Sequence, residues 1–498
     1  MSKARSLLSA SLLALTVGGC VVGPNYQGPP AVAPAAVSAG AFHRADAATP
    51  ATPPPARWWT QLNDPELDHL VDAAFAASPD LEAAVARLRQ SRAGLRQSQA
   101  QLMPSTGASA LYLRAQGLSN ALGGGSSSSS SSSSQSGQGG SQGSSSDNTL
   151  QFYDVGFDAT WEIDLFGGQR RAIEGARAQS QAAEDKLQDA QVSLAAEVAQ
   201  AYVTLRDLQQ RLALSRQSVE IESRMLDLTR ERRAGGTASD LDIEQLNNQL
   251  QSTRADAVPL QAQIAEQLDR LAVLTGRAPG ELDDELSAPA ATPLPPAVVA
   301  VGDPADLLRR RPDVRAAEQT LIQKNALIGQ RTADLFPKVE LLGTVGYGSS
   351  DISQLFQPGS FTNVIAPVLQ WKPFDFGRTQ ASIQEAKGER AEAMADYRQT
   401  VLGALQDAEI ALSRFGRQRE SVVSLEAVQA SADRAAQLTQ VRVEGGTADT
   451  LSELDAERQR VSAESGLSQA KAQLTQDYIG LQKSLGLGWG AVDGDARP

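Results

Sequence analysis

Apolar and polar residues alternate at almost every step between residues 150 and 165. The apolar positions near the end of this segment are Val155, Phe157, Ala159, Trp161, Ile163 and Leu165. A period of two is typical of a strand whose two faces meet different surroundings. Weaker alternation predicts three further strands, at 105–115, 338–348 and 361–374. Each segment is long enough to supply the roughly 9 to 11 residues that a tilted strand needs to cross a bilayer. A half-buried strand of a soluble sheet is the alternative.

Four other segments carry apolar residues at alternating steps of three and four, the spacing of helices that pack as coiled coils. Two are very long, 171–233 and 381–443, and two are of medium length, 238–275 and 448–485. Glu222 occupies one seam position of the first long segment, and Pro259 is expected to bend the first medium one. Two shorter helices are predicted at 80–102 and 313–335. A medium and a short helix together match one long helix in length, so we expect such pairs to stack end to end beside it.

This order of elements occurs twice. Phe166-Gly167 returns as Phe376-Gly377, 210 residues later, and Pro79-Asp80 returns as Pro312-Asp313, 233 residues later. The first copy therefore holds 23 extra residues, in the region of the polyserine tract. We predict a duplicated unit. Its parts are repeat 1 at 79–290, a linker at 291–311, repeat 2 at 312–485, a tail at 486–498, and an enlarged disordered loop at 119–148 within repeat 1.

The N-terminus reads as a lipoprotein signal. Basic Lys3 and Arg5 precede an apolar stretch, and small residues stand directly before Cys20, the single cysteine. We predict removal of a signal peptide, 1–19, and acylation of Cys20, whereas a buried structural cysteine is the alternative. Val21 rather than Asp favours the outer membrane. Residues 20–78 then form a tether and an equatorial segment.

Charge, motifs and composition argue against several classes of protein. The formal net charge is −13, without a basic stripe, so nucleic acid is not an expected partner. His43 and His69 are isolated, and we find no phosphate loop, nucleophile motif or metal-ligand spacing. No enzyme activity, cofactor or metal is therefore predicted. After Cys20 no segment approaches the roughly 20 apolar residues of a spanning helix, so any membrane crossing must use strands. Four strands cannot close a barrel, so a symmetric oligomer is expected.

Three separated motifs resemble one family. They are Cys20-x-Val22-Gly23-Pro24-x-Tyr26-x-x-Pro29, then Trp58-Trp59-x-x-Leu62-x-Asp64-Pro65-x-Leu67, then Arg310-Arg311-Pro312-Asp313-Val314-Arg315-Ala316-Ala317-Glu318. With the lipoprotein signal and the duplication, the chain resembles the TolC-like outer-membrane efflux factors, specifically the NodT-type lipoproteins. The resemblance covers Cys20 to about Trp489.

The resemblance implies a mainly α-helical homotrimer with transmembrane strands. Three copies of four strands would form a 12-stranded outer-membrane β-barrel, continued by an α-helical coiled-coil barrel in the periplasm. The implied partners are a periplasmic adaptor (membrane fusion protein), an inner-membrane pump of the resistance-nodulation-division (RND) class, and outer-membrane lipid. The implied function is passive conduction of small molecules and drugs in a tripartite efflux system. Two alternatives remain: a periplasmic coiled-coil scaffold or adaptor lipoprotein without a pore, and the outer duct of a type I protein-secretion exporter.

The predicted functional site lies at the two turns that end the long helices. Their residues are Gly235, Gly236, Thr237, Gly445, Gly446 and Thr447. Glycine supplies the left-handed conformation that ends a helix at little cost. The resemblance implies that these turns form the periplasmic tip, where the adaptor docks and the gate closes. Gate residues carried over by position are Asp242, Ser452 and Asp455, with Arg442 and Asp449 near enough to share the network. Ordinary helix-start acids are the alternative for Asp242 and Asp449.

Overall fold

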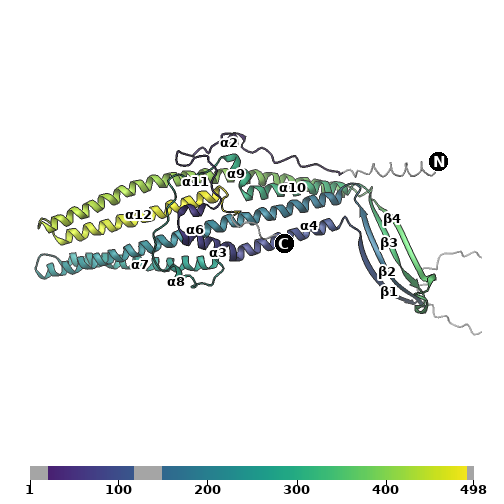
Figure 1. Cartoon of the computed structure of the whole chain (residues 1–498), viewed down its shortest axis with the longest axis horizontal. Helices are drawn as coiled ribbons and strands as arrows, with labels where there is room; N and C mark the ends of the chain where they lie inside the picture. Colours follow the sequence, from purple (N-terminus) through teal and green to yellow (C-terminus); the bar gives the residue numbers. More distant parts are fainter. Residues whose placement is uncertain (1–20, 117–148, 491–498) are drawn as a thin grey trace, which may run out of the picture. The chain divides into compact units, whose positions relative to one another are not determined.

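The computed structural model of the chain describes residues 21–116 and 149–490, which fall into two compact units (Figure 1). Unit 1 comprises Met1–Tyr26, Ala93–Arg177 and Gln323–Glu389, and unit 2 comprises Gln27–Arg92, Ala178–Ile322 and Arg390–Pro498. Four sequence predictions lie outside the described residues: the signal peptide, acylation of Cys20, the enlarged loop 119–148 and the end of the tail.

Unit 1 is built on one antiparallel sheet in the order β1-β2-β3-β4 (Figure 1). The strands are β1 (Ser105–Gln116), β2 (Thr149–Ile163), β3 (Lys338–Ser349) and β4 (Phe361–Gln370). Phe157 of β2 lies opposite Ala108 and Val345, and its side chain is exposed. The next residue, Asp158, accepts hydrogen bonds from Ser109 (2.7 Å) and Thr344 (3.2 Å). The predicted alternation of apolar and polar faces is therefore confirmed in β2.

The last strand is shorter than the sequence pattern indicates. β4 ends at Gln370, whereas alternation predicts a strand to residue 374. Pro373 cannot donate to a ladder, and Asp375 then accepts backbone hydrogen bonds from Gly377 (3.0 Å) and Thr379 (2.7 Å). These bonds form the turn into the following helix. Pro367 lies inside β4, which is an edge strand of the sheet within one chain.

Two helical hairpins make up most of unit 2 (Figure 1). The first joins α6 (Gly168–Ala234) to α7 (Asp240–Leu274), and the second joins α11 (Arg378–Glu444) to α12 (Thr450–Ser484). Apolar seams set the order α7, α6, α12, α11, because Leu212 packs with Leu260, Leu214 with Val461, and Val422 with Leu467. No helix of the described residues carries an apolar run long enough to span a membrane.

Each medium helix ends where a shorter helix begins. The shorter helices are α4 (Pro79–Ala100) and α10 (Pro312–Ala333). Gly276, after α7, has φ 71°, and a Cβ there would lie 2.3 Å from the carbonyl oxygen of Ala77. Gly486, after α12, has φ 68°, and a Cβ there would lie 2.7 Å from Arg311. These two glycines are 210 residues apart, so both repeats use the same close approach between a medium and a short helix.

Arg311 secures the second of these junctions. It donates to the carbonyl oxygen of Ser484 (2.8 Å) in the last turn of α12, and Arg310 donates to that of Leu485 (3.2 Å). Arg311 also donates two hydrogen bonds to Asp313, of 3.0 and 2.7 Å, and one of 3.4 Å to Asp407 of α11. The Arg-Arg-Pro-Asp motif thus satisfies carbonyl groups that a helix end leaves unpaired, and it ties α10, α11 and α12 together.

An equatorial belt covers one face of α6 and α12. We use this name for α2 (Pro34–Ser38), η1 (Trp58–Leu62), α3 (Pro65–Ala77), α8 (Asp283–Leu286) and α9 (Pro304–Arg310). Trp58 and Trp59 are fully buried, and Tyr478 of α12 donates to the carbonyl oxygen of Trp58 (3.1 Å). Tyr202 of α6 donates to Asp64 (2.8 Å), which also caps α3. The Trp-Trp motif therefore anchors the belt to both helices.

Replacing Arg311 tests the junction. The Arg311 side chain is only 12% exposed, so Arg311→Ala removes the cation that pairs with Asp313 and the donor to the Ser484 carbonyl oxygen at the end of α12. We expect the variant to lose about 3 kcal/mol of stability and roughly 5 °C of melting temperature, followed by circular dichroism. Arg309→Ala is the control, because that side chain is 75% exposed and pairs only with Asp306 in its own helix. Equal melting temperatures for the two variants would contradict this account.

Candidate functional site

The two turns predicted as the functional site have the same geometry. Gly236 and Gly446 adopt the left-handed conformation, with φ of 77° and 70°. The next residues, Thr237 and Thr447, donate backbone hydrogen bonds to the carbonyl oxygens of Arg232 (2.9 Å) and Arg442 (2.8 Å). This is the pattern of a Schellman motif. The conformational role predicted for glycine is confirmed at the second glycine of each pair.

Two of the predicted gate acids cap the helices that follow the turns. Ser239 and Asp242 form a capping box at the start of α7, and Asp242 accepts from both the N–H and the hydroxyl of Ser239 at 2.8 Å. Asp449 caps α12 by accepting from the N–H (2.9 Å) and the hydroxyl (2.6 Å) of Ser452. The bonds from Ser239 lower the pKa of Asp242. Within one chain both acids therefore act as helix-start residues.

Asp449 also joins the two hairpins. Arg232, at the end of α6, donates to Asp449 Oδ2 at 2.6 Å, with both side chains less than half exposed. Sequence reasoning missed Arg232, although the repeat offset of 210 makes it the counterpart of Arg442. The hydrogen bond from Ser452 and then the bond from Arg232 hold the pKa of Asp449 well below its ordinary value. The tip thus carries a charged link between residues 217 positions apart.

The structure gathers most of the other predicted site residues in one groove between α11 and α12. Arg442, Asp449 and Asp455 line it together with Gly446 and Thr447. Asp455 is paired with Arg458 (2.9 Å) and accepts from Gln459 (2.9 Å). Asp242 lies apart, at the start of α7 in the other hairpin. The groove can therefore act through Arg442, Asp449 and Asp455 together, whereas Asp242 acts separately.

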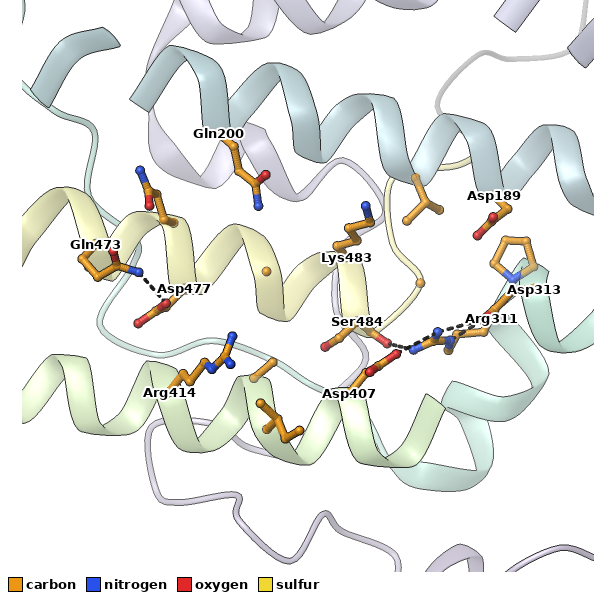
Figure 2. Close-up of a pocket in the computed structure, with 17 residues that line it drawn as sticks. Asp189, Gln200, Arg311, Asp313, Asp407, Arg414, Gln473, Asp477, Lys483 and Ser484 are labelled. Carbon is orange, nitrogen blue, oxygen red and sulfur yellow. Dashed lines mark hydrogen bonds and ion pairs between the residues drawn. The ribbon is translucent and has the colours of Figure 1, made fainter. Parts of the chain in front are cut away.

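A second polar site lies deeper in unit 2. A cavity of about 540 Å³ is lined by residues of α6, α11, α12 and the start of α10, several of which are labelled in Figure 2. Asp189 and Asp477 line it, and burial raises the pKa of both carboxyl groups. Arg414 and Lys483 also point into it (Figure 2). Sequence reasoning did not identify this cavity, because its residues come from segments nearly 300 positions apart.

One histidine is less isolated than the sequence indicates. Glu66, His69 and Glu285 each place a possible ligand atom within 4.8 Å of the others. Glu285 already forms an ion pair with Arg277 at 2.7 Å, which satisfies its charge. The arrangement therefore reads as a surface charge cluster of the equatorial belt.

A four-stranded antiparallel sheet combined with two very long helical hairpins defines the class of outer-membrane channels. The family model described as "Outer membrane efflux protein" matches residues 70–277 and 304–487. Outer membrane protein OprJ from Pseudomonas aeruginosa is 30% identical over 97% of this chain and 96% of its own length. Nodulation protein T from Rhizobium leguminosarum bv. trifolii is 27% identical over 96% of each chain.

Solved structures agree with this classification. The outer-membrane channel OprN is 34% identical with a TM-score of 0.81, covering 94% of this chain and 100% of that one. The open state of the MtrE outer membrane channel from Neisseria gonorrhoeae is 26% identical with a TM-score of 0.74, covering 94% and 98%. The chain therefore belongs to the outer membrane efflux protein family. It is an outer-membrane channel component of an efflux system. The family to which it belongs consists of transport proteins rather than enzymes.

The ion pair between Arg232 and Asp449 should stabilise the fold in a pH-dependent way. Because the pKa of Asp449 is lower in the folded chain, its stabilising effect is complete above the unfolded pKa and is lost as the pH falls through the folded one. The difference in melting temperature between the native chain and Arg232→Gln should be constant from about pH 7 to 5 and shrink below about pH 4. Arg230→Gln, which breaks only a pair inside α6, serves as the control. A difference that stays constant down to strong acid would exclude the ion pair.

Proposed function

We propose that three copies of the chain assemble into the outer duct of a tripartite efflux system. The observation that carries this proposal is that both edges of the sheet are unpaired in the described part of one chain. Within the described residues β1 and β4 each pair on one side only, so each leaves a row of backbone N–H and C=O groups unpaired. Lipid offers no partner for these groups. Three sheets joined β1 to β4 would close a 12-stranded barrel and pair every strand.

The proposed path continues between the helical hairpins. Six hairpins, two from each copy, would surround a conduit that ends at the Gly-Gly-Thr turns. We place a periplasmic adaptor at Gly235-Gly236-Thr237 and Gly445-Gly446-Thr447, with an RND-type inner-membrane pump behind it. The charged link between Arg232 and Asp449, the groove around Arg442 and Asp455, and Asp242 on the neighbouring hairpin support a gate at this tip. Acylation of Cys20 would add a lipid anchor.

Small organic molecules are the proposed substrates. Relatives are named for efflux of antibiotics (ArpC of Pseudomonas putida), efflux of toluene and export of pyoverdine. These names favour small-molecule efflux over protein secretion. The channel would conduct passively, because the energy comes from the partner pump.

Assembly is tested by molar mass. Detergent-extracted protein should have the mass of a trimer by light scattering, since four strands cannot close a barrel in lipid. A monomer that keeps the β-sheet signal in circular dichroism would overturn the proposed assembly.

The gate is tested by conductance in planar bilayers. Asp449→Asn removes the charge that binds Arg232, a link worth about 0.2 to 1 kcal/mol per chain after solvent screening, so we expect higher single-channel conductance. We expect Asp242→Ala to raise conductance as well, by removing the tip carboxylate that the family resemblance places at the gate. Asp455→Asn should instead weaken cation selectivity, because a ring of carboxylates in a pore attracts cations.

Asp240→Asn is the matched control. Asp240 lies one helix turn from the tip but binds only Arg233 of its own hairpin, and its side chain is 79% exposed. It should leave conductance and selectivity unchanged. If the Asp242, Asp449 and Asp455 variants all behave like this control, the tip acids act only as helix caps and the gate lies elsewhere.

A further inference from the structure

A groove of about 590 Å³ runs between α6, α7 and α12 in unit 2. It lies on the side of α6 opposite the equatorial belt. Gln209 of α6 donates to the carbonyl oxygen of Leu286 in the belt, whereas Ser218, nine residues later, lines the groove. At about 100° per residue, nine residues correspond to the opposite side of the helix. In the proposed assembly this side faces the conduit, if the belt is the outer surface.

Glu222 lines this groove and has a buried carboxylate oxygen without a hydrogen-bond partner in the described part of the chain. Its side chain is 2% exposed, and Oε2 has no hydrogen-bond partner among the described residues. Apolar residues of the α6–α12 seam, Leu214 and Val461, line the same groove. A buried carboxylate without a partner costs several kcal/mol unless a proton or a cation neutralises it.

The two basic residues that line the groove are paired with other acids. Arg458 forms its ion pair with Asp455 at 2.9 Å, and Arg211 forms its pair with Asp207 at 3.6 Å. Asp256, from α7, adds a second carboxylate to the lining. The groove therefore presents negative charge that its own arginines leave uncompensated.

The duplication shows that the fold does not require this acid. The residue 210 positions after Glu222 is Ala432, on α11, which occupies the equivalent place in the second repeat. A small apolar residue is thus compatible with a long helix of the same length and type. The acid in the first repeat is a difference between two otherwise matched helices, which points to a role in binding.

We propose that this groove binds organic cations, with their ammonium N–H groups donating to Glu222. The proposal rests on the proposed channel function and names its substrate class. A single buried carboxylate beside apolar walls of Leu214, Leu260 and Val461 suits an ammonium group on an apolar body. A divalent metal ion would need about six oxygen ligands, which this lining does not gather at one point. The volume is in the range of pockets for drug-sized ligands.

Binding is measured on the intact purified channel with dansylcadaverine, a primary ammonium with a fluorescent apolar body. Glu222→Gln keeps the shape of the side chain and removes its charge, so we expect affinity to fall about tenfold or more. Glu220→Gln is the matched control, because Glu220 lies two residues away, is 65% exposed and pairs with Arg224. It should bind like the native chain. Dansylamide, which lacks the ammonium group, should bind equally weakly to all three proteins.

A third variant separates binding from folding. Glu222→Leu places an apolar residue in the coiled-coil seam, so we expect a higher melting temperature together with loss of dansylcadaverine binding. Equal affinity of the native chain and Glu222→Gln would overturn the proposal, as would a lower melting temperature for Glu222→Leu, which would mean that a protein group already satisfies the acid. Trimer mass and conductance of Glu222→Gln report separately on the proposed channel and should match those of the native chain.

Discussion

Unpaired backbone groups at the edges of β1 and β4 are the constraint on which the rest of the molecule depends. In water such an edge would be tolerable, but in lipid each unpaired N–H or C=O costs several kcal/mol. The sheet is therefore incomplete as a single chain, and only other copies of itself can complete it. The helices also present surfaces that a neighbouring chain could cover. The helices bury a core within one chain, but several large apolar residues of α11 remain exposed and available to a neighbouring chain, among them Leu402, Val423 and Leu438.

The two repeats share the residues that permit close backbone approach and differ in the charged residues that form individual contacts. Gly276 and Gly486 permit the same close approach at both helix junctions. Only the second junction has an arginine clamp, because Arg311 corresponds to Ser78 at the upstream offset of 233. Glu222 likewise has Ala432 as its counterpart. Duplication thus provides an internal comparison: shared residues maintain the chain path, and unshared ones mark the places where each repeat has acquired its own contacts.

Much of this architecture follows from short-range pattern. The period of two located the strands, and steps of three and four located the helices, because both depend on residues close in sequence. Alternation predicts a β4 that is four residues too long, because the pattern persists past Gln370 although Pro373 cannot join the ladder. The caps at Asp242 and Asp449 follow from a Ser or Asp three residues before its partner. The link from Arg232 to Asp449 could not be read this way, since it depends on how two hairpins pack, and the cavity in Figure 2 has the same origin.

The charged link at the tip is not repeated around the whole ring. Asp449 of the second repeat corresponds to Ser239 of the first, which carries no charge. Arg232 binds Asp449 inside one chain, but the equivalent contact between neighbouring chains of the proposed trimer would join Arg442 to Ser239. Six hairpins of similar shape therefore have two kinds of boundary, one charged and one neutral. Such a ring would part first at its three neutral seams, and the charged links would limit how far the two hairpins of each chain can then separate.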